Sequence, residues 1–113
     1  MTPSDRTDVT LVLTTAPDRE VAERVGAAVV EDRLAACANV LPGMTSIYWW
    51  ADEVQRESEV LILLKTTSGG VEALRRRIVE LHPYDVPEVI ALTVGAGHEP
   101  YLEWVRSEVG ARS

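Results

Sequence analysis

Continuous runs of apolar and β-branched residues along the chain predict four strands. They are Val9–Leu13, Ala35–Trp50, Glu59–Thr67 and Val89–Val94. The first and third are apolar enough for central positions in a sheet, while Pro42-Gly43 breaks or bends the second. Only the polar link Ala51–Arg56 separates the second strand from the third. The two are therefore predicted to form an antiparallel hairpin.

Apolar residues spaced three and four positions apart predict three helices, over Asp18–Leu34, over 71–81 and from Pro100 onward. Thr15 and Asp18 match a capping box before the first helix, and Ser68 is a predicted N-cap for the second. In the last helix, Tyr101, Trp104 and Val105 are expected on one side.

The resulting order β-α-β-β-α-β-α predicts an α+β fold of the ferredoxin-like, split βαβ kind, with an antiparallel sheet. The 113 residues suit one domain, 1–113, with 1–8 frayed. Two helices are expected to cover one sheet face. The other face is then too apolar for water unless the last helix and the loops cover it, so self-association is favoured.

Composition narrows the classes of function. Lysine and arginine number 11 against 18 acidic residues, a net charge of −7, which disfavours nucleic acid as a ligand. The basic run Arg75-Arg76-Arg77 is interpreted as a solvated helix face. One cysteine, Cys37, excludes a disulfide within the chain and favours the cytoplasm. No apolar stretch approaches the about 20 residues of a membrane span.

Five blocks, in this order, resemble the CutA family of divalent-cation tolerance proteins. They are Leu34-Ala35-Ala36-Cys37-Ala38-Asn39, Ser46-Ile47-Tyr48-Trp49-Trp50, Glu59 with Lys65-Thr66, His82-Pro83-Tyr84-Asp85-Val86-Pro87-Glu88, and Tyr101-Leu102-Glu103-Trp104. The resemblance implies a homotrimer with extended hairpins, similar to PII-type signalling proteins. It also implies a part in tolerance of copper or a similar divalent cation, with no settled molecular activity. The chain is predicted not to be an enzyme.

The resemblance also assigns candidate residues. Cys37 and His82 match the family's thiol and imidazole candidates for metal. The candidate ligand-binding residues near the subunit cleft are Tyr48, Trp50, Glu59, Lys65, Tyr84, Glu88 and Trp104. Thr14 stands where some bacterial members have a first-strand cysteine, which weakens any copper site that relies on that thiol.

Each candidate also has a structural interpretation. Cys37 fits a small buried hydrophobe as well as a soft-metal ligand. His82 fits a cap on a free carbonyl, and Tyr84 and Trp104 fit core rings with satisfied polar tips. Lys65, the only lysine, is expected to pair with a carboxylate, Glu59 lying upstream on the same strand, although an anionic ligand is the alternative.

Other functions compete with metal tolerance. An enzyme with Cys37 as nucleophile and His82 and Asp85 behind it needs three groups in mutual hydrogen-bond reach, and nothing local supports that arrangement. RNA binding on this fold needs stacking aromatics on the central strands, which Val9–Leu13 and Val60–Leu64 lack. A nucleotide or metabolite sensor of the PII kind, or a structural trimer with no metal role, stays open.

Overall fold

A computed structural model describes residues 7–110 of the chain, and it has the predicted order of elements. Most of the segment expected to be frayed, residues 1–6, lies outside the described residues. The strands are β1 (Val9–Ala16), β2 (Cys37–Trp50), β3 (Glu53–Thr67) and β4 (Val89–Thr93). The helices are α1 (Arg19–Glu31), α2 (Val71–Leu81) and α3 (Glu99–Glu108), with a short 3-10 turn, η2 (Ser68–Gly70), before α2.

The four strands form one antiparallel sheet in the order β2-β3-β1-β4. The central positions of β1 and β3 confirm the prediction from their apolar runs. Val12 of β1 lies opposite Leu64 of β3 on one side and Ala91 of β4 on the other. This topology is the split βαβ arrangement, and the α+β prediction is confirmed.

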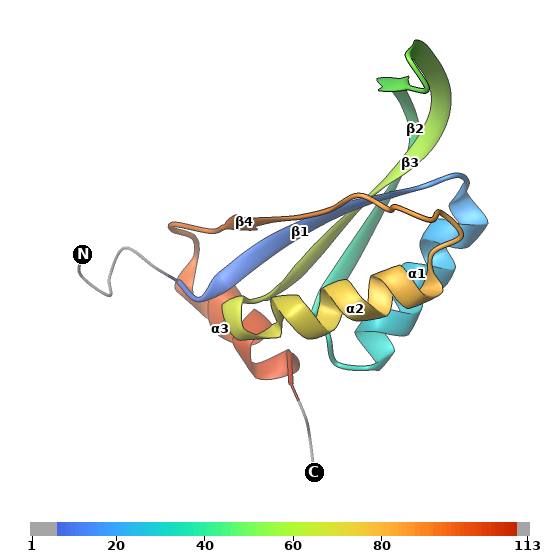
Figure 1. The fold of residues 1–113 in the computed structure, drawn as a ribbon. Coiled ribbons are helices and arrows are strands. Elements are labelled where there is room, and N and C mark those ends of the chain that lie inside the picture. The colour runs from blue at the N-terminus through green and yellow to red at the C-terminus, as the bar shows by residue number, and fades with distance from the viewer. Residues whose placement is uncertain (1–6, 111–113) are drawn as a thin grey trace.

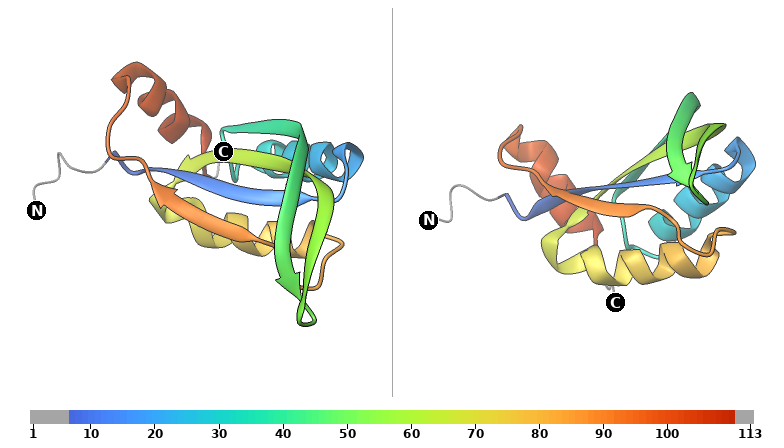
Figure 2. Two further views of the ribbon diagram at one scale, coloured as in Figure 1. Left: turned by 90° about the horizontal axis from the view of Figure 1, so that it is seen from above. Right: turned by 45° about the horizontal axis from the view of Figure 1, so that its top comes forward.

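Helices α1 and α2 cover one face of the sheet (Figure 1). Val12, Ile62 and Leu64 from the central strands are fully buried there against Val25 of α1 and Ile78 of α2. Helix α3 packs elsewhere: its Leu102 and Val105 form a second, smaller cluster with Val9 at one end of the opposite face (Figure 2). The main core therefore lies between one sheet face and two helices.

Much of the rest of that opposite face is apolar and not covered by a helix of the chain, and we call this apolar part the open face. It consists of Leu11, Leu13, Leu41, Leu61, Leu63, Ile90 and Leu92, which the strand register places on one side of the sheet. Ile90 and Leu92 on edge strand β4 are each 51 % exposed, and Leu41 on edge strand β2 is 43 % exposed. The sequence-based expectation of an apolar, unprotected sheet face is thus met in the single chain.

Strands β2 and β3 continue past the sheet as a long hairpin arm (Figures 1 and 2). The register shifts between Leu41 and Met44, so the break predicted at Pro42-Gly43 is a bulge in β2, with Gly43 at φ 90°. The link is shorter than the expected Ala51–Arg56. Trp50 pairs directly with Glu53, which leaves a two-residue turn. Cross-strand pairing thus extends through most of the segment that was predicted to be the polar link.

Both predicted helix caps are wrong. The side chain of Asp18, not Thr15, caps α1 by accepting the backbone N–H of Val21 at 2.9 Å. Ser68 belongs to η2, and its hydroxyl lies 3.3 Å from the hydroxyl of Thr10. Gly70 occupies the N-cap position of α2, without a side-chain cap. The apolar spacing located each helix correctly. The short turn η2 comes before α2, so the cap of α2 is Gly70 and not Ser68.

The predicted face of α3 is also corrected. Leu102 and Val105 are the buried residues of this helix, whereas Tyr101 and Trp104 are 43 % and 41 % exposed. Because Val9 at the end of β1 contacts Leu102 and Val105, the two rings turn outward and pack on each other. None of the helices within residues 7–110 is long and apolar enough to cross a membrane.

The hairpin turn yields a stability prediction. Ala51 and Asp52 have φ values of 52° and 63°, and a non-glycine residue in this left-handed region is destabilised by about 1–2 kcal/mol. Two-residue turns with both φ values positive favour Asn-Gly. The double substitution Ala51→Asn with Asp52→Gly should therefore raise the melting temperature, measured at fixed protein concentration. An unchanged or lower melting temperature would show that the turn carries no such strain.

Candidate functional site

Cys37 lies at the start of β2, half-buried, on the side of the sheet that α3 partly covers. Its Sγ atom is 3.6 Å from Oδ1 of Asn39 and 3.9 Å from Nζ of Lys65. Burial, followed by contact with this thiol, raises the pKa of the Tyr101 hydroxyl. Cys37 is thus neither fully buried nor surrounded by further metal-binding side chains.

Lys65 does not pair with Glu59, so that prediction is wrong. Its ammonium group donates to Oδ1 of Asn39. Lys65 on β3 pairs with Cys37 on the neighbouring strand β2. Glu59 lies six residues upstream on the same strand and bonds Tyr84 instead. An extended strand separates residues i and i+6 by about 20 Å, which is too far for an ion pair.

His82 follows α2 directly and is 8 % exposed. Its Nδ1 accepts the backbone N–H of Tyr84 at 3.1 Å, so Nε2 carries the proton and donates to the carbonyl of Thr15 at 2.6 Å. The imidazole does satisfy a carbonyl, as one interpretation expected, but the carbonyl belongs to β1 rather than to the helix. Both ring nitrogens are engaged within the chain.

The structure does not bring Cys37 and His82 together in one chain. Cys37 is opposite Lys65, which is opposite Leu11, whereas His82 bonds Thr15 at the far end of β1. Four strand residues span about 13 Å. Within residues 7–110, no group of three or more His, Cys, Asp or Glu side chains is placed to hold a metal ion. Within the described residues of one chain, Cys37 and His82 therefore do not share a metal site, and the arrangement needed for a Cys37 nucleophile is not assembled either.

Two phenol–carboxylate pairs lie where the hairpin arm leaves the sheet. The Tyr84 hydroxyl donates to Glu59 Oε2 at 2.9 Å, and the Tyr48 hydroxyl donates to Glu57. Burial first, then the bond to Glu59 and the charges of Glu57 and Asp18, raise the pKa of Tyr84 to about 12. This corner holds a concentrated negative charge with two phenolic groups, an arrangement that suits a cation.

Two of the remaining candidate residues, Trp50 and Trp104, lie apart from this corner. Trp50 is at the hairpin tip and 66 % exposed, and Glu88 is exposed just before β4. Trp104 stacks on Tyr101, with ring centroids 5.5 Å apart. The seven predicted ligand residues therefore do not form a single cleft in one chain. Tyr48, Glu59 and Tyr84 lie near the arm's base.

Sequence reasoning missed three residues that the structure adds to these sites. Asn39 is two positions after Cys37, and Glu57 is two positions before Glu59, so the period of a strand places each beside its neighbour on one face. The two-residue period of a strand could therefore have identified Asn39 and Glu57. No pattern in the sequence pointed to Tyr101, since only the docking of α3 brings its hydroxyl to Cys37.

Thr14, the residue in place of a first-strand cysteine, is fully buried and faces the helices, because it lies opposite Ile62. Cys37 is on the other side of the sheet. Thr14 Oγ1 has no hydrogen-bond partner among the described residues. Thr14 therefore belongs to the helix-facing core and not to the environment of Cys37.

A comparison with known protein families matches residues 10–108 to CutA1 divalent ion tolerance protein. The match covers nearly all of the described chain. This chain belongs to the CutA1 family. The family resemblance seen in the sequence blocks is confirmed.

Individual relatives of this CutA1-family chain support the same assignment. The divalent-cation tolerance protein CutA of Thermus thermophilus is 48 % identical over 100 residues, covering 88 % of this chain and 97 % of its own. Its solved structure superimposes with a TM-score of 0.88 at 47 % identity, over 90 % of this chain and 99 % of that one. The CutA crystal structure from Xylella fastidiosa gives a TM-score of 0.89 at 40 % identity, over 91 % of this chain and 99 % of that one.

Other relatives are longer. Human CutA is 49 % identical over 98 residues, which are 87 % of this chain but 55 % of the human protein. The names of relatives place two in the chloroplast, from rice and Arabidopsis thaliana, and one in the periplasm, from Archaeoglobus fulgidus. The cytoplasmic location expected from the single cysteine stays a prediction.

The unpartnered Thr14 hydroxyl predicts a stabilising substitution. Thr14→Val keeps the shape and removes a buried polar group, which should raise the free energy of unfolding by about 1 kcal/mol in denaturant titrations. Thr66→Val is the matched control. The Thr66 hydroxyl donates to the Leu34 carbonyl at 2.8 Å, so its loss should destabilise the chain. Destabilisation by both substitutions would show that Thr14 has a partner.

The raised pKa of Tyr84 predicts a loss of stability at alkaline pH. The folded chain keeps this phenol protonated where the unfolded chain, with a pKa near 10, begins to lose the proton. The contribution is complete below pH 10 and disappears as the pH rises through about 12. In an ultraviolet absorbance titration, the tyrosine that ionises last should be absent in Tyr84→Phe and ionise earlier in Glu59→Gln, while Tyr101, whose pKa is also raised, is unaffected. An unchanged high-pH end of the titration in Tyr84→Phe would contradict the assignment.

Proposed function

We propose that this CutA1-family chain acts as a homotrimer in divalent-metal tolerance, and that copper or a similar divalent cation binds where subunits meet. The observation that carries the proposal is the position of Cys37. The thiol lies on the side of the sheet that carries the open face, while the described chain offers no complete metal site of its own.

The open face supports the self-association step. Its six leucines and Ile90 come from all four strands. Full burial of an exposed leucine or isoleucine stabilises a protein by about 1.5–3 kcal/mol, and the half-exposed Leu41, Ile90 and Leu92 would gain part of this on association. A soluble monomer rarely leaves a continuous apolar patch of this kind exposed. Further copies of this chain are the partner that the family resemblance implies.

Metal binding would then depend on assembly. A thiolate is a good ligand for copper or zinc, but one thiol alone holds neither tightly. Lys65 and Asn39 beside Cys37 supply no second thiolate or imidazole. In the proposed trimer, a neighbouring subunit adds the missing ligands. His82 takes part only if its ring gives up the bond to Tyr84 or to Thr15, since both nitrogens are engaged.

A second candidate function rests on the acidic corner at the base of the arm. Tyr84 and Tyr48, each bonded to a glutamate, present aromatic surface beside negative charge. Such a corner suits a small cationic ligand in a PII-like sensor that has no metal role. Titrations of metal-free protein with a small cationic ligand and with metal ions separate the two functions. Glu59→Gln would abolish binding of the cationic ligand at this corner and leave metal binding at Cys37 intact.

The substitution Leu92→Asp tests the open face and the metal site at the same time. This exposed edge residue contributes little to the fold of one chain, but a buried carboxylate would oppose association. We expect the unmodified protein to sediment as a trimer and Leu92→Asp as single subunits. Zn²⁺ and Cu²⁺ binding by calorimetry should fall sharply in Leu92→Asp and in Cys37→Ser.

Val79→Asp is the matched control, because Val79 is 42 % exposed on α2, away from the open face. It should remain trimeric and bind metal normally. A stable monomer of the unmodified protein would overturn the assembly proposal. Full metal binding by monomeric Leu92→Asp would overturn the shared site, and no binding by any form would leave the cationic-ligand function as the better candidate.

A further inference from the structure

The sequence contains one cysteine and one lysine, and the fold places them directly opposite each other. Cys37 on β2 pairs with Lys65 on β3 in the antiparallel register, so both side chains extend from the same side of the sheet. The Nζ atom of Lys65 lies 3.9 Å from the Sγ atom of Cys37. The only thiol and the only side-chain amine therefore meet within one subunit.

Asn39 holds these two groups at one place. Its Oδ1 atom lies 3.6 Å from the Cys37 sulfur and also accepts from the Lys65 ammonium group. On the side of α3, the Tyr101 hydroxyl contacts the thiol, and the Trp104 ring packs on the Tyr101 ring. This arrangement leaves the half-buried sulfur within reach of a small oxidant and keeps the amine beside it.

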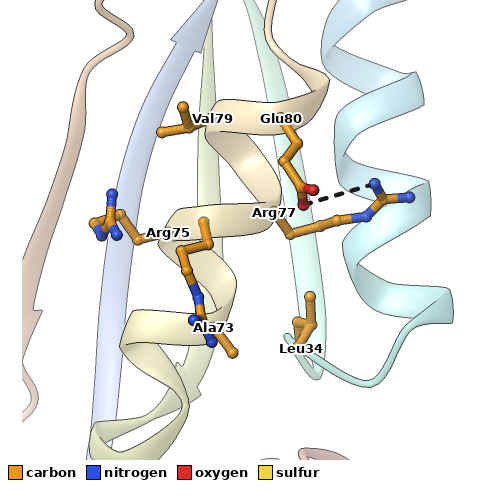
Figure 3. A pocket seen from close by; sticks show the side chains of 7 residues that line it. Leu34, Ala73, Arg75, Arg77, Val79 and Glu80 are labelled. Carbon is orange, nitrogen blue, oxygen red and sulfur yellow. Dashed lines mark ion pairs between the residues drawn. The ribbon is translucent and has the colours of Figure 1, made fainter.

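The other cationic side chains cannot replace Lys65. A guanidinium group stays protonated in proteins, so an arginine is not a nucleophile. Arg75 and Arg77, from the run predicted to be a solvated face, line a hollow on the outer side of α2 (Figure 3). There Arg77 pairs with Glu80 at 3.9 Å, on the far side of the helix layer from Cys37. Lys65 is therefore the amine that an oxidised Cys37 meets.

We propose that Cys37 and Lys65 form a reversible sulfur–nitrogen crosslink when hydrogen peroxide oxidises the thiol. In the first step the thiolate sulfur takes a hydroxyl group from the peroxide, the O–O bond breaks, and the other oxygen leaves as hydroxide. The sulfur is thereby oxidised to a sulfenic acid and the peroxide is reduced.

In the second step the Lys65 amine, after releasing its extra proton, attacks that sulfur. The S–N bond forms, the S–O bond breaks, and the sulfenic hydroxyl leaves with one amine hydrogen as water. Sulfenic acids condense in this way with a nearby thiol or nitrogen. Because Cys37 is the only cysteine, no second thiol of the same chain competes with Lys65.

Reduction reverses the crosslink. A dithiol breaks the S–N bond, becomes a disulfide itself, and gives its two hydrogens to the sulfur and the nitrogen. While the bond is in place, Cys37 has no thiolate to offer a metal ion, a consequence that rests on the proposed function. The pair would then act as a redox switch on the thiol.

The test treats metal-free protein with an equimolar amount of hydrogen peroxide and measures the intact mass. The product should be about 2 Da lighter, and dithiothreitol should restore the original mass. Trypsin cannot cleave after a crosslinked Lys65, so the digest should contain Leu34–Arg56 joined to Glu57–Arg75.

Lys65→Arg is the matched control, because it keeps the positive charge and removes the nucleophilic amine. It should stop at the sulfenic acid, which is about 16 Da heavier and reacts with dimedone. The same crosslink mass in Lys65→Arg would place the nitrogen elsewhere and overturn the proposal. A sulfenic acid that persists in the unmodified protein would do the same, and so would disulfide-linked dimers formed in place of the crosslink.

The crosslink does not depend on the proposed trimer. Both groups belong to one chain, so it should form equally in Leu92→Asp, and a crosslink confined to the assembled protein would contradict the assignment to one chain. Failure of the trimer changes sedimentation and leaves the mass of the peroxide product unchanged. The two failures are therefore distinguishable.

Discussion

The central strands of this protein are apolar on both faces, while two helices can cover only one. Val12, Ile62 and Leu64 point into the main core, and the alternate residues Leu13, Leu61 and Leu63 point the other way. Strand geometry allows no alternative, since neighbouring side chains always alternate. The sheet is therefore stable on its helix side and unfinished on its other side. The fold, the proposed assembly and the placing of Cys37 all depend on this asymmetry.

Helix α3 shows how little of the second face one chain can protect. Leu102 and Val105 reach Val9 at the end of β1, and the exposed leucines and isoleucines begin beyond that contact. Arg106 anchors this helix through its bond to the Thr7 carbonyl at 2.7 Å, and Arg33 anchors its end through Glu108. The short helix is thus tied to the residues just before β1 and just after α1, while the middle of the face stays uncovered.

Polar groups at the other end of the sheet are satisfied in a different way. His82 links the end of α2 to β1, and two residues later Tyr84 reaches Glu59 on β3. Those bonds hold the connection before β4 against the base of the hairpin arm. They also explain why His82 serves the structure first, since a buried imidazole with two partners is expensive to release. Across the helix layer, the arginines of α2 face solvent and stay independent of both sheet faces.

Much of this protein could be predicted from local pattern. Continuous apolar runs located every strand and a spacing of three to four residues located every α-helix in order, and the runs placed β1 and β3 at the centre. The family blocks led to CutA1, and the alternation of the strands predicted an uncovered apolar face. These features depend on residues close together in the sequence or on side-chain chemistry alone, which is why the sequence by itself determined them.

Only the tertiary structure decided which distant residues meet. Lys65 bonds Asn39 rather than Glu59, Tyr101 reaches Cys37, and Cys37 is held apart from His82. Each of these outcomes depends on strand register or on the docking angle of a helix, and a shift of one residue would exchange the partners. The caps of α1 and α2 also differ from those predicted. A cap depends on the path of the backbone in the folded chain and not on the residue type alone. Register and docking are set by the packing of the whole core, and no local pattern contains them.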